Sequence, residues 1–180
     1  MTTLWFRQLL CGKDIAVRAS SAAEAELFAG AASMANFSYL VGCTRAKECV
    51  IVDGAWDVDG IKRIVEKEGF RLIGAAYTHH HYDHVGGDPP PRLAQFPRGS
   101  PGAREFAAAS LPVYIHEADA DELVSRTHTP AEALTRVRDG DRVDAGGDVK
   151  LRVMHTPGHS AGGVCFVVEE AGGAIEPGGG

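Results

Sequence analysis

The apolar and polar positions of the chain follow two periods, which predict short strands alternating with helices. Two apolar runs, residues 37–42 and 48–53, are joined by a polar connection, which is typical of a β-hairpin. Apolar side chains then recur at helical spacing over residues 58–68, after Asp57 as a predicted N-cap. A mostly apolar run over residues 72–78 follows, so the order strand, helix, strand predicts a right-handed crossover in a partly parallel sheet.

The remaining segments extend this mixed α/β pattern. The motif Thr129-Pro130-Ala131-Glu132 resembles a capping box with proline at the first helical position, so a helix is predicted over residues 129–138. The prolines of residues 88–101 predict an irregular surface loop next to the histidine-rich segment 79–84. We further expect strands over residues 4–10, 112–116, 149–153 and 163–168, a helix over 117–125, and a short helix or irregular insertion within 19–35.

Composition and charge narrow the classes of function. The 180 residues are 44% hydrophobic and 23% charged, which suits a soluble globular chain with one sizeable core. A formal net charge of -6 leaves no basic excess to bind phosphate groups, so no nucleic-acid partner is expected. No uncharged apolar stretch approaches the roughly 18 to 20 residues of a membrane span, so we expect no membrane partner either.

The N-terminal segment and the cysteines indicate the compartment. No secretory leader pattern is visible, whereas Arg7, Lys13 and Arg18 leave organelle targeting open as an alternative to a cytoplasmic location. The four cysteines form no CxxC pair, which favours a reduced intracellular setting. Cys165 lies within the apolar run Val164-Cys165-Phe166-Val167-Val168, so it is expected to be a small buried thiol rather than a nucleophile.

The histidines carry the strongest chemical signal. Four of the eight fall within residues 79–84, directly after a predicted buried strand, in the pattern HxHxDH. Ligand sites of α/β sheets gather at such strand ends. Gly86 and Gly87 follow, and they permit the backbone to turn tightly beneath the cluster. We therefore predict a metal site rather than an adventitious histidine-rich tract.

The spacing of these residues suggests how they share metal ions. Side chains two positions apart in an extended segment project to the same side, so His79 and His81 can hold one ion while His80 points away. Asp83 and His84 are displaced by the following turn and can face a second ion. Imidazole and carboxylate ligands suit zinc.

These motifs resemble those of metallo-β-lactamase-fold hydrolases, and most closely the hydroxyacylglutathione hydrolase (glyoxalase II)-like proteins. The resemblance implies an αββα sandwich of two mixed sheets with outer helices, of which this chain supplies mainly the N-terminal half. It implies one domain over residues 1–180, with the motifs within 37–168. The matching segments are THHHYDHVGG at residues 78–87, His155-Thr156-Pro157-Gly158-His159-Ser160, Phe6-Arg7-Gln8-Leu9-Leu10, Met34-Ala35-Asn36-Phe37, Tyr39-Leu40-Val41-Gly42 and Val50-Ile51-Val52-Asp53.

The resemblance also implies a ligand set. His79, His81 and His159 would bind the first metal ion. Asp83 and His84 would bind the second, and Asp83 would also be the catalytic carboxylate. Zinc is expected, two ions per complete site, with iron or manganese as alternatives.

Several other residues near the motifs are not expected to bind metal. Asp53, at the end of its strand, resembles the family position that braces the metal loop by hydrogen bonds. His155 is expected to be supporting or structural, since it lies four residues before His159. His116 and His128 match no ligand motif. Tyr82 is interpreted as an aromatic that shields the site from solvent.

The implied reaction is hydrolysis of a small-molecule substrate, a glutathione-type thioester, by a metal-bound hydroxide that attacks the carbonyl. One alternative is a mononuclear iron persulfide dioxygenase-like protein. Another is a catalytically inactive, truncated metal-binding fragment, because the family's bridging aspartate and last histidine ligand are absent. Glu176 is the only nearby carboxylate, and we do not expect it to bridge. The chain is accordingly expected to be a shortened version of a longer hydrolase.

Overall fold

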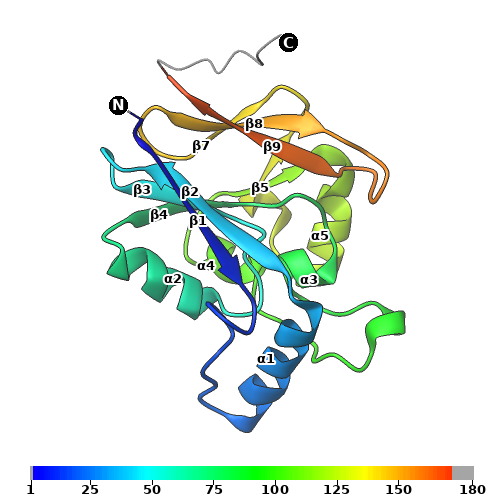
Figure 1. Ribbon diagram of the computed structural model, residues 1–180. Helices are drawn as coiled ribbons and strands as arrows, with labels where there is room; N and C mark the ends of the chain where they lie inside the picture. The colour runs from blue at the N-terminus through cyan, green and yellow to red at the C-terminus, as the bar shows by residue number, and fades with distance from the viewer. Residues whose placement is uncertain (1, 172–180) are drawn as a thin grey trace, which may run out of the picture.

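The computed structural model describes residues 2–171, which form two β-sheets with helices on one side (Figure 1). No helix in this part of the chain has the length and apolar character needed to cross a membrane. The larger sheet contains, in spatial order, β1 (Leu4–Leu10), β2 (Phe37–Cys43), β3 (Glu48–Val52), β4 (Arg71–Ala76), β5 (Val113–His116) and β6 (Leu134–Val137). The smaller sheet contains β7 (Arg142–Asp144), β8 (Val149–His155) and β9 (Val164–Glu170). The α-helices are α1 (Ala22–Met34), α2 (Val58–Lys67), α3 (Tyr82–Val85), α4 (Ala103–Ala108) and α5 (Ala120–Thr127).

The larger sheet is antiparallel at one edge and parallel at the other. β1, β2 and β3 pair antiparallel, which confirms the predicted hairpin. β3, β4, β5 and β6 pair parallel, with α2 connecting β3 to β4 as the crossover predicts. The carboxyl ends of the parallel strands therefore lie at one edge of the sheet, and the histidine segment begins just after β4.

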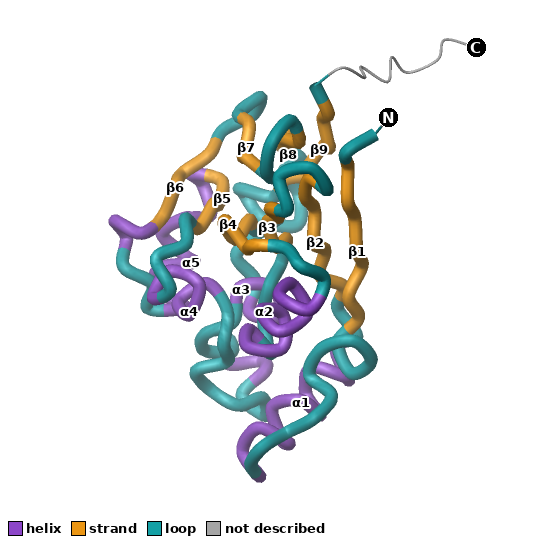
Figure 2. The backbone as a smooth tube through the Cα atoms, turned by 90° about the vertical axis from the view of Figure 1, so that its left-hand side faces the viewer, coloured by secondary structure: helices purple, strands orange, loops and turns teal. Residues whose placement is uncertain are grey.

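The six-stranded sheet lies between the helices and the smaller sheet (Figure 2). One hydrophobic core joins this sheet to the helices and includes Leu40, Ile51 and Ile61, each fully buried. A second core joins the two sheets through side chains such as Val50 and Leu151. β3 lies inside the sheet and is buried on both faces from Cys49 to Val52, which explains its continuous apolar run.

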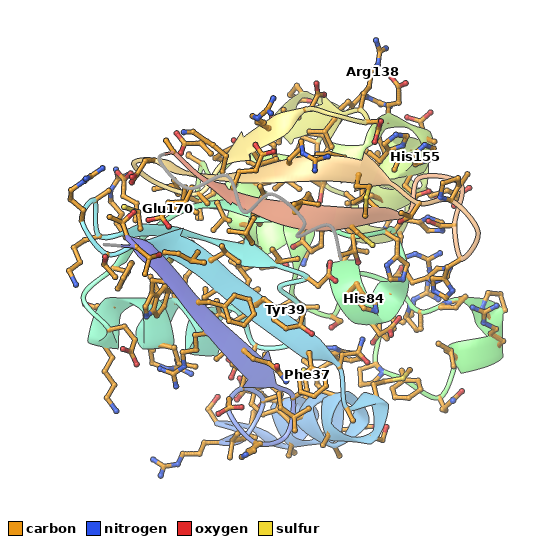
Figure 3. The ribbon with its side chains drawn as sticks, turned by 45° about the horizontal axis from the view of Figure 1, so that its top comes forward. Phe37, Tyr39, His84, Arg138, His155 and Glu170 are labelled. Atoms are coloured by element: carbon orange, nitrogen blue, oxygen red, sulfur yellow. The ribbon has the colours of Figure 1, made fainter. Side chains whose placement is uncertain are left out.

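Three aromatic side chains form a group on β1 and β2, and one of them, Tyr39, packs against the edge of the second core. Phe6 is 54% exposed and Phe37 is 42% exposed. The rings of Phe6 and Tyr39 stack with centroids 5.7 Å apart, and Phe37 lies 6.4 Å from Tyr39. Figure 3 shows Phe37 and Tyr39 along β2, two residues apart and therefore on the same face.

The predicted helix over residues 129–138 is wrong. The segment forms a 3₁₀ turn, Ala131–Ala133, and then β6, which pairs parallel with β5 from Leu134 to Val137. Pairing at the sheet edge satisfies the backbone groups that a helix would have satisfied internally, and it buries Val137. The strand β7 and the helix α4 were not predicted at all.

The expected burial of Cys165 is also wrong, because its side chain is exposed. Cys165 follows Val164, which is buried against the other sheet, so the alternation of the strand directs Cys165 to the outer face of β9. The other boundaries move slightly. Residues 117–125 begin with the 3₁₀ turn Glu117–Asp119 before α5, and the uncertain segment 19–35 contains α1.

The predicted N-cap of α2 offers a first test of these assignments. The Asp57 carboxylate accepts hydrogen bonds from Gly60 N (2.7 Å) and Ala16 N (2.9 Å), and thus ties the helix to the segment after β1. Asp57→Ala should lower the free energy of unfolding by about 1–2 kcal/mol, because both amides lose their partner. Urea denaturation would measure this loss. Asp59→Ala, at an exposed position in the same first turn, is the matched control and should leave stability nearly unchanged.

Candidate metal centre

Three imidazoles from two distant segments meet beside the ends of the parallel strands. His79 and His81 lie in the loop after β4, and His159 lies in the loop between β8 and β9. One nitrogen from each can be chosen so that all three lie within 4.8 Å of one another. Nδ1 of His81 is 2.8 Å from Nε2 of His159. The structure therefore brings together the three predicted ligands of the first ion, and His80 is not among them.

The burial, hydrogen bonding and protonation of His79 are those expected of a metal ligand. Its side chain is buried, and its Nδ1 lies 2.9 Å from Thr78 Oγ1. Its Nε2 is buried without a hydrogen-bond partner among residues 2–171. Burial, followed by the neighbouring His84, lowers the pKa of His79 to about 4, so the ring is neutral at pH 7. A neutral imidazole with one nitrogen oriented and the other unpaired is the form that binds zinc.

Asp83 and His84 form a second group next to the first. His84 Nε2 lies 3.4 Å from Asp83 Oδ2, and the His84 ring is 4.2 Å from that of His79. Burial alone would lower the pKa of His84, but its contacts with Asp53 and Asp83 outweigh this effect and raise the pKa to about 10. Without a bound cation, His84 would therefore carry a positive charge at pH 7. A second ion bound by Asp83 and His84 would displace that proton.

Asp53 connects this group to the end of β4. Its Oδ1 accepts a hydrogen bond from Thr78 N (2.8 Å), and its Oδ2 accepts one from Thr78 Oγ1 (2.7 Å). The same Oδ2 lies 3.0 Å from His84 Nδ1. These are the contacts that a brace of the metal loop would make, and they orient His84 through the nitrogen that faces away from Asp83.

Two residues without a predicted role fix Asp83. Asn36 Nδ2 donates to Asp83 Oδ2 at 2.7 Å and lies 3.1 Å from the Asp83 carbonyl oxygen, to which Trp56 Nε1 also donates at 3.1 Å. Asn36 belongs to a segment that carried the family resemblance. Its side-chain contact was not foreseeable, however, because Asp83 lies 47 positions away in the sequence.

Asp119 is a further residue that the sequence did not reveal. It is 1% exposed, and its carboxylate accepts hydrogen bonds from His80 N (3.1 Å), Ser160 Oγ (2.7 Å) and Gly162 N (2.6 Å). It therefore connects the loop of His79 and His81 to the loop of His159. Gly162 is required here, since an added Cβ would lie 2.7 Å from the Asp119 side chain. In the sequence, Asp119 is indistinguishable from the other acidic residues of a helix start.

The sequence profile of the Metallo-beta-lactamase superfamily matches residues 34–175, which contain every residue of this centre. The chain belongs to that superfamily. The expected fold is thereby confirmed, with two sheets and outer helices that correspond to the N-terminal half of the metallo-beta-lactamase fold. Glu176, the carboxylate considered above as a bridging ligand, lies outside the residues that the structure describes.

Individual members of the superfamily agree with this assignment. The probable polyketide biosynthesis zinc-dependent hydrolase BaeB of Bacillus velezensis is 28% identical over 135 residues, 75% of this chain and 52% of that protein. The probable hydroxyacylglutathione hydrolase glo2 of Schizosaccharomyces pombe is 31% identical over 136 residues, 74% of this chain and 43% of that protein. A solved metallo-beta-lactamase from Staphylococcus aureus superposes with a TM-score of 0.63 at 24% identity, covering 95% of this chain and 40% of that one. The chain thus spans about half the length of the curated relatives it matches.

His155 lies outside the ligand group and contacts the loop that carries His159. Its backbone N donates to Asp139 Oδ1 (2.8 Å), and its Nε2 lies 2.9 Å from the Ala161 carbonyl oxygen. Its ring stacks on that of His116 with centroids 4.1 Å apart. His128 lies elsewhere, as the exposed residue that ends α5 in a left-handed conformation.

The turn beneath the ligands is tight and rests on a buried aromatic pair. Gly86 has φ 77°, and an added Cβ would lie 2.6 Å from the Ser100 carbonyl oxygen, so glycine is needed there. Tyr82 is 1% exposed, and its ring meets Trp56 edge-on at 5.1 Å. Its hydroxyl donates to the Pro97 carbonyl oxygen at 2.7 Å. Tyr82 therefore fills the space below the metal loop.

Proposed function

We propose that the chain carries the principal metal-binding part of a metal-dependent hydrolase whose substrate is a glutathione-type thioester. The observation that carries this proposal is the unpaired, buried Nε2 of His79 beside His81 and His159. The superfamily includes relatives named as hydroxyacylglutathione hydrolases, which supports the thioester class. The four free cysteines of the described residues support a reduced, cytoplasmic setting.

In this proposal His79, His81 and His159 hold one metal ion, and Asp83 with His84 holds a second. Bound zinc would supply Lewis acidity that polarises the thioester carbonyl. Burial opposes the ionisation of Asp83, but hydrogen bonds from His84 and Asn36 outweigh it and keep the pKa of Asp83 below its usual range. Asp83 is therefore an anion at pH 7, able to bind a cation. Asp53 and Asp119 orient the two loops.

The proposed function predicts hydrolysis of S-lactoylglutathione that depends on zinc. The purified chain, stripped with a chelator and reloaded with zinc, should recover thioester cleavage together with bound metal measured by elemental analysis. Stripped protein is the control. Bound zinc without cleavage would contradict the hydrolase and leave a metal-binding fragment. Bound iron with oxygen uptake on glutathione persulfide would instead favour the dioxygenase-like alternative.

A further inference from the structure

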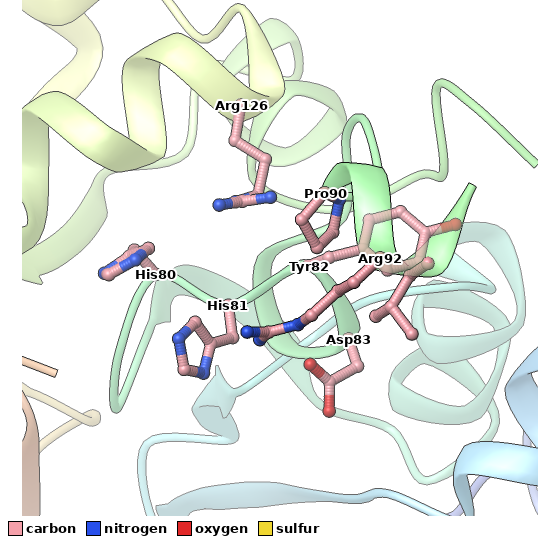
Figure 4. A pocket seen from close by; sticks show the side chains of 8 residues that line it. His80, His81, Tyr82, Asp83, Pro90, Arg92 and Arg126 are labelled. Carbon is pink, nitrogen blue, oxygen red and sulfur yellow. The ribbon is translucent and has the colours of Figure 1, made fainter. Parts of the chain in front are cut away.

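A cavity of about 200 Å³ opens beside the candidate metal centre. His81 and Asp83 form one part of its wall, and two arginines from separate elements form another. Arg92 lies in the 3₁₀ turn Pro91–Leu93, and Arg126 lies in the last turn of α5. Figure 4 shows both guanidinium groups pointing toward the space next to His81.

Arg126 is held by one hydrogen bond, but another of its N–H groups has no acceptor among residues 2–171. Its Nη1 donates to the Asp88 carbonyl oxygen at 3.2 Å, which fixes the direction of the side chain. Its Nε is buried and has no hydrogen-bond partner among residues 2–171. A buried charged donor without an acceptor is unfavourable, so this geometry favours a ligand that supplies one.

The protein supplies little negative charge to the two arginines. Within the described part of the chain, neither Arg92 nor Arg126 forms an ion pair. The Asp88 carboxylate is engaged by Arg98 at 2.9 Å. The Asp83 carboxylate is engaged by Asn36 at 2.7 Å and lies beside His84. The cavity therefore concentrates positive charge in a chain whose formal net charge is -6.

We propose that Arg92 and Arg126 bind an oxyanion of the substrate, a carboxylate or a phosphate, next to the metal centre. The planar guanidinium fork matches both groups and fixes their orientation. The proposal rests on the proposed function only in taking the ligand to be the thioester substrate. It restricts that substrate to thioesters with an anionic group close to the reacting carbonyl, and it makes the two arginines determinants of specificity.

The test is a binding titration with matched thioether probes, which cannot be hydrolysed. N-acetyl-S-methylglutathione is compared with its uncharged diethyl ester, and S-methylphosphopantetheine with S-methylpantetheine, so that the two pairs separate a carboxylate from a phosphate ligand. Calorimetry on the zinc-loaded chain should show at least one anionic probe binding about tenfold or more tighter than its neutral partner, equivalent to about 1.4 kcal/mol.

Variants of Arg92 and Arg126 test whether these two residues cause the preference for the anionic probe. Arg126→Gln and Arg92→Gln should each weaken the anionic probe about tenfold and leave the neutral probe unchanged. Arg126→Lys keeps the charge without the fork and should lie between Arg126→Gln and the parent. Arg98→Gln is the control, since Arg98 is on the same loop but pairs with Asp88 outside the cavity. Thermal unfolding checks that each variant is folded.

Two results would overturn the inference: equal binding of charged and neutral probes by the parent chain, or a charge preference that survives in the Arg92→Gln, Arg126→Gln double variant. Because binding requires no turnover, this outcome is separate from that of the proposed function. Charge preference without thioester cleavage would keep the subsite and refute the hydrolase. Cleavage without charge preference would keep the hydrolase and refute the subsite.

Discussion

Replacing His79 by alanine should weaken zinc binding by more than about 100-fold, which exceeds the 10–100-fold typical of losing only a supporting partner. The change removes the buried, neutral imidazole whose Nε2 has no other partner in the described structure. His81 and His159 alone would leave the ion with two protein ligands, one fewer than zinc sites ordinarily use. Competition against a zinc-binding dye measures the affinity directly.

A second measurement distinguishes the loss of a metal ligand from misfolding of the variant. Zinc that binds only the folded chain should raise the thermal midpoint of the parent protein, and the increase should disappear in His79→Ala. His128→Asn is the matched control, because His128 is exposed and asparagine tolerates its left-handed conformation. Retention of parental zinc affinity in a folded His79→Ala protein would refute the three-histidine site.

Replacing Asp119 by alanine should both destabilise the fold and loosen the metal centre. The change leaves His80 N, Ser160 Oγ and Gly162 N without their shared acceptor. We expect the free energy of unfolding to fall by about 3 kcal/mol, because each buried unsatisfied group costs about 1–3 kcal/mol. Zinc affinity should fall by about 10–100-fold, since the loop of His159 loses its tie to the loop of His81.

The two effects of Asp119 are separable by the conservative variant Asp119→Asn. The asparagine amide keeps one oxygen that can accept a hydrogen bond, but its NH₂ group cannot accept one from the other donors. Asp119→Asn should therefore be more stable than Asp119→Ala and still bind zinc less tightly than the parent. Asp121→Ala, two residues later in the first turn of α5 and with a 90% exposed side chain, should change neither property. Parental zinc affinity in folded Asp119→Ala would show that the carboxylate serves stability alone.

The sequence was sufficient to locate the site where its ligands are close neighbours along the chain. His79 and His81 were found because their spacing and the preceding strand are local properties, and His159 was added by resemblance. Asp119 and Asn36 were not found, because Ser160 lies 41 positions from Asp119 and Asp83 lies 47 positions from Asn36, and only the assembled sheets bring these partners together. Arg126 was missed for the same reason, since its role depends on a cavity rather than on a pattern.

The errors in the fold also arise from contacts that no local pattern contains. Residues 129–138 have a helical start signal, but parallel pairing with β5 outweighs it and yields β6. Cys165 looks buried within its apolar run, yet only one face of β9 packs against the other sheet. In both cases a tertiary contact decided the outcome: the conformation of residues 134–137 in the first, and the exposed face of a correctly predicted strand in the second.

The distance along the chain between the ligands has a consequence for the order of assembly. His159 follows His81 by 78 positions, and its loop connects two strands of the smaller sheet, whereas the loop of His79 and His81 follows β4 of the larger sheet. During synthesis at about 5–20 residues per second, the first two ligands emerge several seconds or more before the third. If all three histidines hold the ion as proposed, tight metal binding requires that β8 and β9 have docked on the larger sheet. The rate of zinc uptake during refolding should then report the rate of this docking.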